Sequence, residues 1–435
     1  MSANSPALAA PSAPPSQHTS PPSAPFPGLR PFGASEASLF FGRREHVEAL
    51  LAKLQRQRLL AVVGTSGSGK SSLVLAGILP RLDRGYRTPT GTSWRIVTMR
   101  PGSDPIAHLA LALQSAREQD DDQPRGELAP AEDGRASGTR LGRADAALQR
   151  DLLRIDLERS SNGLLEAVRN LELDPGENLL LLVDQFEELF RFHHLVHGQA
   201  RDVAAAFVKL LLRASEQQQL PIYVMLTLRS DFLGECVAFP GLAEAISEGQ
   251  YLIPLLNRDQ RAEVIRGPIG VAEASISTAL VQRLLNDAGD MTDQLPVLQH
   301  AMMRTFELAQ AASEAGAPVH VELSHYEAAG AMTGALSLHA DQAYAEVGRR
   351  LGLRGQRVAE RLFRCLTDGN EHGGGVRRPC RVSEVMAAAG CDLPTLAAVV
   401  LAFIDQRRGF LVQQPAGELT PQTTLDISHE SLMRK

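Results

Sequence analysis

Apolar and polar positions divide the first 256 residues into short, mainly apolar runs separated by longer stretches with helical spacing. The apolar runs are 59–63, 94–99, 179–183, 222–228 and 251–255. Continuous runs of this length are typical of strands that are covered on both faces of a parallel sheet. Because helical stretches separate them, the pattern predicts an α/β fold with a doubly wound, parallel, five-stranded core sheet.

The pattern becomes mostly helical after residue 256. Helical spacing over 258–265, 276–288, 295–310 and 324–349 predicts a small helical domain that spans residues 257–352. Further helices are expected at 356–367, 382–389 and 394–407, followed by strands at 409–413 and 424–428. Three helices and a two-stranded wing describe a winged helix, so residues 353–435 are predicted to form a winged-helix domain.

Two segments lack any such periodicity. Residues 1–24 consist largely of Ala, Pro and Ser, a composition that buries too little apolar surface to offset the entropy of ordering. This segment is expected to be a disordered tail. Residues 117–143 are rich in Asp, Glu, Gly, Pro and Arg, and are expected to be a flexible surface insertion within a core domain of residues 25–256.

The segment after the first apolar run carries the strongest chemical signature. It reads Gly64-Thr65-Ser66-Gly67-Ser68-Gly69-Lys70-Ser71, a complete G-x-x-x-x-G-K-S phosphate loop, and continues into a helix at Ser72. The glycines let backbone N–H groups converge on an anion at the helix N-terminus. Lys70 is expected to reach the β- and γ-phosphates, and the Ser71 hydroxyl to coordinate Mg²⁺. The chain is therefore predicted to be a P-loop NTPase.

Acidic residues follow the third apolar run directly. Asp184 lies at the carboxyl end of that strand, where P-loop enzymes hold the Mg²⁺ shell. Glu187 and Glu188 are both candidates for the acid that orients or deprotonates the attacking water. The alternative is that they are acids in the first turn of a helix, where they favour the helix dipole.

A second polar cluster, Thr227-Leu228-Arg229-Ser230-Asp231, ends the fourth apolar run. Because the carboxyl ends of parallel strands meet at one edge of a sheet, Arg229 is a candidate sensor of the γ-phosphate. The alternative is a surface salt bridge between Arg229 and Asp231.

Composition excludes several other functions. The net charge of −6 and the pI near 6.1 argue against binding to bulk nucleic acid or to anionic membranes. The four cysteines form no C-x-x-C pair, so neither a zinc site nor a disulfide framework is indicated. The sequence has no signal peptide and no apolar stretch long enough to span a membrane, so we expect a cytoplasmic protein.

The motifs in their order along the chain resemble the novel STAND NTPases of bacteria, which are signal-transducing ATPases related to the NACHT and apoptotic-ATPase groups. The resemblance runs from about residue 25 to the end, and the motifs that carry it are Pro27–Phe32, Phe40–Arg43, the phosphate loop, Leu182–Phe190, Leu228–Phe232, Gln294–His300 and Ser428–Leu432. It implies an ATP/ADP switch in which a helical domain and a winged-helix domain close over the nucleotide.

The resemblance also implies roles for single residues. Phe41, Gly42 and Arg43 match the segment that lines the base and the ribose, and Pro296 matches the proline that packs near adenine. Arg229 matches the first sensor arginine. His429 resembles the histidine that contacts the β-phosphate of ADP in related switches, although a surface position at a helix start is the alternative for this residue.

The leading functional prediction is thus a slowly hydrolysing ATPase switch for signal transduction, which self-associates in its active state. Family members usually continue into a C-terminal repeat sensor, so the winged-helix domain is expected to be truncated here and the sensor to be absent. One alternative is a DNA-binding ATPase regulator, but the expected recognition helix, 394–405, has no basic residue. The other is a small-molecule kinase, for which no acceptor pocket is evident.

Overall fold

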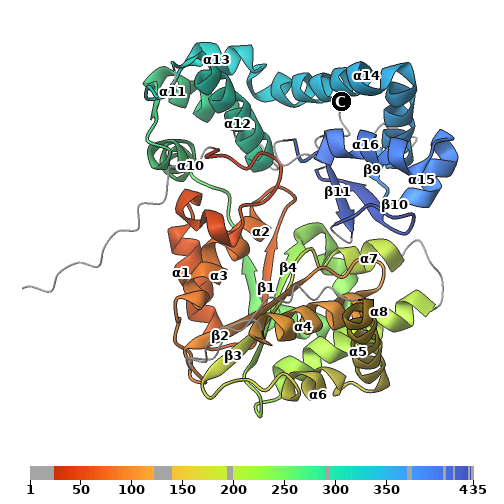
Figure 1. Ribbon diagram of the computed structural model, residues 1–435. Coiled ribbons are helices and arrows are strands. Elements are labelled where there is room, and N and C mark those ends of the chain that lie inside the picture. The colour runs from red at the N-terminus through yellow and green to blue at the C-terminus, as the bar shows by residue number, and fades with distance from the viewer. Residues whose placement is uncertain are drawn as a thin grey trace, which may run out of the picture.

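The computed structural model describes residues 24–121, 140–193, 199–289, 294–314, 316–369, 375–404, 408–414, 417–429 and 432. Nearly all of the predicted N-terminal tail and the middle of the predicted insertion therefore lie outside the described residues. The described chain forms a core with a central sheet, a group of helices and a C-terminal unit, which we define as residues 353–429 (Figure 1).

The central sheet has five strands in the order β2-β3-β4-β1-β5, and every neighbouring pair is parallel. The strands are β1 (Leu59–Gly64), β2 (Ser93–Met99), β3 (Glu177–Val183), β4 (Ile222–Arg229) and β5 (Gln250–Leu252). The predicted five-stranded parallel core is confirmed. The fifth strand is shorter than the predicted 251–255 because Pro254 has no N–H to continue the ladder, although the Ile253 N–H still donates to the Val63 carbonyl at 2.8 Å.

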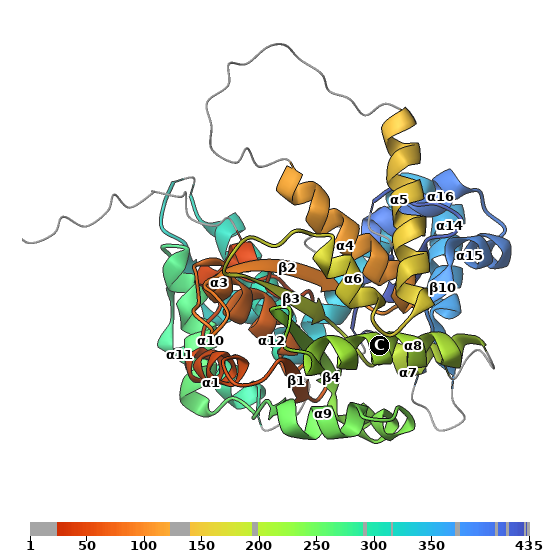
Figure 2. The ribbon, with the colours of Figure 1, turned by 90° about the horizontal axis from the view of Figure 1, so that it is seen from below.

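Helices cover both faces of this sheet (Figures 1 and 2). On one face, Leu60 and Val62 pack against α1 (Arg44–Leu54) and against the helix that follows the phosphate loop. That helix consists of α2 (Lys70–Ser72), a π-helical turn η2 (Leu73–Ile78) and α3 (Leu79–Asp83). On the other face, Ala61 and Val63 belong to a second apolar cluster. Its helices are α4 (Pro105–Asp121), α5 (Arg140–Arg159), α6 (Gly163–Arg169), α7 (Glu188–His193), α8 (Gln199–Glu216), the 3₁₀ segment η3 (Ser230–Ala238) and α9 (Leu242–Gly249).

The ends of the predicted insertion are helical. Residues 117–121 continue α4 and residues 140–143 begin α5, and these two helices run side by side (Figure 2). The helical spacing of residues 144–171 predicts one continuous helix, and this prediction is wrong because the chain breaks between α5 and α6. At Gly163 an added Cβ would lie 2.4 Å from the Asp156 carbonyl oxygen, so the chain turns back too closely for a continuous helix.

The helical domain follows. It contains α10 (Arg258–Val271), α11 (Thr278–Asp287), α12 (Gln294–Ala312) and α13 (Leu323–Ala328), and a short parallel pair joins β6 (Ser275–Ile276) to β7 (His320–Val321). Its apolar core includes Leu284, Leu298 and Phe306, and also Phe26 from the start of the described chain. Phe26 is thus anchored in the helical domain, whereas Leu29 packs into the apolar cluster of the C-terminal unit and Phe32 packs with Ala76 of the core.

One element connects the helical domain to the C-terminal unit. The helix α14 (Ala331–Cys365) is interrupted only at Gly352, which has φ +66° and ψ −164°. The helical stretch predicted for 324–349 is divided into α13 and the first half of α14, and a single non-helical residue separates that half from the helix predicted for 356–367. Ala343 and Val347, which precede the break, pack into the apolar cluster of the C-terminal unit.

The C-terminal unit contains three helices and a small sheet. The second half of α14 is followed by α15 (Val382–Ala389) and α16 (Leu393–Ile404). The sheet has three strands, where two were predicted: β10 (Cys380–Arg381) pairs with β12 (Thr424–Ile427), which also pairs with β11 (Leu411–Gln414). A hairpin of β8 (Thr367–Gly369) and β9 (Gly375–Arg377), which the sequence pattern does not predict, precedes them.

Among the described residues, no single helix is long and apolar enough to cross a membrane. The pair α15 and α16 reaches that length and composition together, but the two helices are bent by 109° relative to each other.

Candidate nucleotide-binding site

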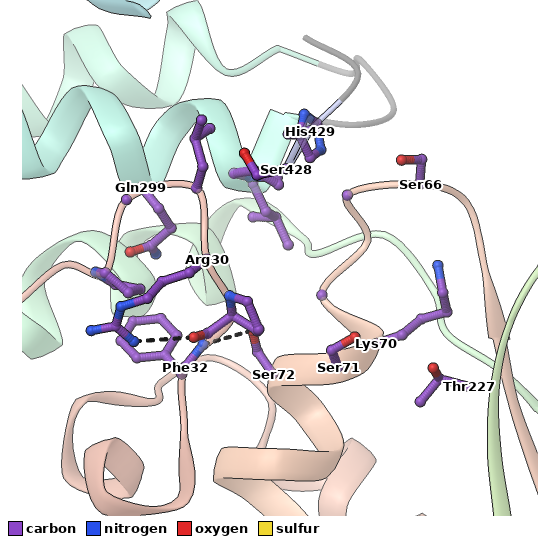
Figure 3. Close-up of a pocket in the computed structure, with 18 of the residues that line it drawn as sticks. Arg30, Phe32, Ser66, Lys70, Ser71, Ser72, Thr227, Gln299, Ser428 and His429 are labelled. Carbon is purple, nitrogen blue, oxygen red and sulfur yellow. Dashed lines mark hydrogen bonds between the residues drawn. The ribbon is translucent and has the colours of Figure 1, made fainter. Parts of the chain in front are cut away.

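One cavity lies where the core, the helical domain and the C-terminal unit meet (Figure 3). The phosphate loop contributes Ser66, Gly67, Gly69, Lys70, Ser71 and Ser72 to its lining. Segment 27–32 near the N-terminus, residues Pro296 and Gln299 of α12, and Ser428 and His429 after β12 line its other sides. In Figure 3, Ser66, Lys70 and Ser71 lie toward one end of this cavity, and Arg30 and Phe32 toward the other.

The phosphate loop has the backbone that an anion cradle requires. Gly67 and Gly69 have φ values of +66° and +89°, which only glycine adopts readily, and the loop leads directly into α2. The Lys70 ammonium donates to the carbonyl oxygens of Gly64 (2.9 Å) and Thr65 (2.7 Å). Burial lowers the pKa of Lys70, and the nearby Glu187 carboxylate opposes this effect. The loop therefore holds its own cation in place next to the cavity.

Asp184 is the centre of a buried hydrogen-bond network. Its Oδ1 accepts from the Ser71 hydroxyl and from the Thr227 hydroxyl, both at 2.7 Å. Its Oδ2 lies 3.3 Å from the guanidinium of Arg100. The backbone N–H of Gln185 in turn donates to Thr227 Oγ1 at 2.8 Å. Strand β4 lies between β3 and β1 in the sheet, so Thr227 bridges the strand end that carries Asp184 and the loop that carries Ser71.

The donor set at this network fits Mg²⁺. A hydroxyl and a carboxylate that share a hydrogen bond are close enough to serve one cation, and both are hard oxygen ligands. The described residues contain no group of three or more His, Cys, Asp or Glu side chains that could hold a metal ion. Mg²⁺ is commonly held by one or two protein ligands together with phosphate oxygens and water, so Ser71 and Asp184 suit a metal that arrives with a nucleotide.

The two candidate acids occupy different places. Glu187 lines the cavity, and its Oε2 accepts from the backbone N–H of Arg229 at 3.3 Å. Glu188 does not line the cavity, and its Oε2 accepts from the backbone N–H of Gly102 at 3.0 Å. Burial raises the pKa of both carboxyls, that of Glu188 to about 7, although the charge of Arg100 opposes the shift at Glu188.

Arg229 lines the cavity, as a sensor of the γ-phosphate would. It also forms the salt bridge with Asp231 that is the alternative to this role. Its Nε lies 3.1 Å from Asp231 Oδ1 and its Nη2 lies 2.7 Å from Asp231 Oδ2. The guanidinium also lies over the ring of Phe232, 5.7 Å from the centroid. This pairing orients the side chain of Arg229 at the edge of the cavity.

The segment Phe41–Arg43 packs between the core and α10. Phe41 and Arg43 line the cavity, whereas Gly42 faces the helical domain. Gly42 has φ +76°, and an added Cβ would lie 2.7 Å from the Gln260 carbonyl oxygen. Arg43 donates to the carbonyl oxygens of Pro254 (2.8 Å) and Ser68 (3.1 Å), so it ties the phosphate loop to the segment after β5. Burial lowers the pKa of Arg43 to about 10.

The two residues expected from outside the core also line the cavity. Pro296 lies in the first turn of α12, next to Leu295, whose Cδ1 would be 3.6 Å from a Cβ added to Gly69. His429 follows β12 and is 9% exposed. The predicted residues that do not line the cavity are Gly42, Gly64, Thr65, Ser68, Asp184 and Glu188, and each except Gly64 is adjacent in sequence to one that does.

Sequence reasoning missed several polar side chains at this site. Thr227 belongs to the predicted strand-end cluster but received no role. Arg100 directly follows β2, so the rule that led to Asp184 and Arg229 would also have found it. Arg377 lines the cavity from β9, a strand that no sequence pattern indicates.

Comparison with protein families decides the assignment. The family model for novel STAND NTPase 1 matches residues 25–435, almost the whole chain. The chain belongs to this family. It is therefore a P-loop NTPase, which agrees with the nucleotide-binding geometry of the loop.

A search of curated proteins found no match for this STAND NTPase. Among solved structures, it resembles Cdc6p from Pyrobaculum aerophilum (13% identity, 90% of each chain covered, TM-score 0.36). It also resembles a Walker-type ATPase of Pyrococcus abyssi (14% identity, 93% of this chain and 97% of the other, TM-score 0.39). A third similar structure is the ORC2 protein of Aeropyrum pernix, solved as ADPNP–ADP complexes (12% identity, 90% of each chain, TM-score 0.42). These scores are too low to support an inference about function.

Proposed function

We propose that this STAND NTPase is an ATP-binding molecular switch for signal transduction, which hydrolyses ATP slowly to ADP and phosphate and changes its domain arrangement and self-association with the bound nucleotide. The observation that carries the proposal is the shared cavity. Lys70 of the core, Pro296 of the helical domain and His429 of the C-terminal unit all line it. A ligand that touches all three parts can favour one arrangement of them over another, which is the requirement for a ligand-driven switch.

The chain offers a place for each part of the nucleotide. The phosphate loop and Lys70 would hold the phosphates, and Ser71 and Asp184 would hold Mg²⁺. Phe41, Arg43 and Pro296 would enclose the base and the ribose. Mg²⁺, when bound, would supply positive charge that neutralises the phosphate oxygens.

Among the acids, Glu187 is the better candidate for orienting the attacking water. It lines the cavity, and the backbone N–H of Arg229 fixes its Oε2. Burial raises its pKa, which brings a carboxyl closer to the range in which it can accept a proton from water. Glu188 is turned toward Gly102, so we propose that it supports the strand-end network rather than touching the water. Arg229 would stabilise charge at the γ-phosphate.

The experiment is a comparison of shape with and without nucleotide. Small-angle scattering of the protein alone, with ADP and with a non-hydrolysable ATP analogue should give different radii of gyration for the two nucleotide states. Lys70→Ala should abolish nucleotide binding and with it the difference, and His429→Ala should keep binding but lose most of the difference. Lys209→Ala, at an exposed position in α8 away from the cavity, is the matched control. Identical radii in the two nucleotide states would contradict the switch.

The DNA-binding alternative has less support. The helix α16, which occupies the position of a recognition helix, has no charged residue between Leu393 and Ile404. It buries Leu396, Val399 and Phe403 in the C-terminal unit and exposes Leu401. Readers of base edges use Arg, Lys, Asn or Gln on that face. A salt-dependent shift of duplex DNA by the protein would favour this alternative.

A further inference from the structure

An arginine of the C-terminal unit points to a second contact with the nucleotide. Arg377 is the last residue of β9, and its side chain is 14% exposed. It lines the same cavity as Lys70 and Arg229, although it belongs to the C-terminal unit and they belong to the core. No motif in the sequence marks this position.

Only part of the Arg377 guanidinium is satisfied by the protein. Its Nη1 donates to the carbonyl oxygens of Ile427 (2.9 Å) and Ser428 (3.4 Å) and lies 3.8 Å from Asp426 Oδ2. Its Nε is buried and has no hydrogen-bond partner among the described residues. Buried donors without acceptors are costly, so such a group is expected to meet an acceptor when the site is filled.

The surroundings of Arg377 favour an anion as that acceptor. The Arg191 guanidinium donates to the Arg377 carbonyl oxygen at 3.2 Å, and burial, together with the charge of Arg377, lowers the pKa of Arg191. Lys70 and Arg229 add two more cations to the cavity, and Arg229 already pairs with Asp231. Asp426 partly balances Arg377, but at 3.8 Å it makes no close contact. An anion between these cations would reduce their mutual repulsion.

We propose that Arg377 binds the β- or γ-phosphate of the nucleotide from the C-terminal unit, opposite Lys70. The inference rests on the proposed function, because it assumes that the cavity holds a nucleotide. The same guanidinium holds the carbonyl oxygens of Ile427 and Ser428, which immediately precede His429. Phosphate binding at Arg377 therefore also fixes the segment that carries His429, and the phosphate charge offsets the repulsion between the cations of the C-terminal unit and those of the core.

The competing explanation is that Arg377 only holds the backbone of residues 427 and 428 in position and does not contact the nucleotide. Both roles predict little effect on AMP, because His429 is itself expected at the β-phosphate and AMP lacks the β- and γ-phosphates. The two roles differ once His429 is removed. A residue that acts only by positioning His429 then has no effect on nucleotide binding, whereas a direct phosphate ligand still strengthens the binding of ADP and ATP.

The test measures the affinity of AMP, ADP and a non-hydrolysable ATP analogue by calorimetry with excess Mg²⁺. Arg377→Gln should weaken ADP and the ATP analogue by about 10- to 100-fold, as expected for loss of a hydrogen bond to a charged group, and AMP by less than about threefold. Arg377→Lys should restore part of the loss, because it keeps the charge but not the planar fork. The adjacent, exposed Arg378→Gln is the matched control and should bind like the parent protein.

A double variant separates the two explanations. If Arg377 touches phosphate itself, Arg377→Gln should weaken ADP binding further when His429 is already Ala. If it acts only through His429, the second substitution should add nothing. Equal losses for AMP, ADP and the ATP analogue, or no loss at all, would overturn the proposal. Lys70→Ala tells this failure apart from that of the proposed function, because retained nucleotide affinity in that variant would refute the nucleotide site as a whole.

Discussion

The buried carboxyl of Glu188 gives a prediction about stability and pH. Glu188 is 8% exposed, and its nearest partner is the backbone N–H of Gly102. Burial raises its pKa from an ordinary value of 4.5 to about 7, even though Arg100 and the Gly102 hydrogen bond both favour the charged form. The substitution Glu188→Gln replaces this titrating group with a neutral one of the same shape.

The sign and the size of the effect follow from the two pKa values. Between pH 4.5 and about pH 7 the folded protein holds the Glu188 proton while the unfolded chain has released it. The unfolding free energy of the parent protein therefore falls as the pH rises through this interval, and stays reduced above it. The difference between the two pKa values corresponds to about 3 kcal/mol. The unfolding free energy of Glu188→Gln minus that of the parent should thus increase by about 3 kcal/mol as the pH rises from 4.5 to 8.

Urea unfolding at several pH values measures this gain. The only tryptophan, Trp94, lies on β2, with its ring 5.0 Å from that of Tyr223, so its fluorescence reports the unfolding of the core. Glu166→Gln, at an exposed position in α6, shows the effect of removing a surface carboxylate. If the stability difference between Glu188→Gln and the parent changed by less than about 1 kcal/mol over this range, the reasoning about burial at Glu188 would be refuted.

Three other substitutions test the site. Thr227→Val removes the hydroxyl between Asp184 and Gln185 and should lower the unfolding free energy by about 2–4 kcal/mol in urea, whereas Thr227→Ser should stay within about 1 kcal/mol of the parent. Equal losses in the two variants would contradict this role. Glu187→Gln should bind ATP normally but slow phosphate release by about 10²–10⁴-fold, and release at the parent rate would place the catalytic acid elsewhere. Gly267→Ala puts a Cβ within 2.7 Å of three Phe41 ring atoms and should weaken nucleotide binding by about 1–3 kcal/mol in calorimetry; unchanged affinity would remove Phe41 from the binding site.

The core was predictable because its three central strands, β1, β3 and β4, are apolar and buried along almost their whole length. Burial on both faces leaves no polar alternation in these strands, so each coincides with an apolar run. The outer strands β2 and β5 are only partly buried, and the match is less complete there. The phosphate loop and Asp184 were found for a related reason: their chemistry depends on residues that are local in sequence. The break between α5 and α6 was missed because it depends on the close approach of Gly163 to the Asp156 carbonyl oxygen, which helical spacing does not reveal.

The remaining parts of the site depend on contacts between distant segments. Arg377 reaches the cavity only because the β8–β9 hairpin folds toward residues 427 and 428, about fifty positions later in the chain. Similarly, the different surroundings of Glu187 and Glu188 come from Arg229 and Gly102, which lie on two other strand ends. Adjacent residues of one type cannot be assigned separate roles until those partners are known.

The break in α14 has a stereochemical consequence. At φ +66° and ψ −164°, Gly352 occupies a region that is essentially closed to L-residues, yet an added Cβ would meet no atom within 4 Å. The mirror image of this conformation lies in the polyproline II region, which L-residues adopt readily. A D-residue has the mirror-image preferences of an L-residue, so it would readily adopt the conformation found at position 352. A D-alanine introduced by peptide ligation would therefore fit without strain, while L-alanine would not. The angle between the two halves of α14 thus depends on the backbone conformation of a single residue. D-alanine at position 352 would stabilise this angle, and L-alanine would disturb it.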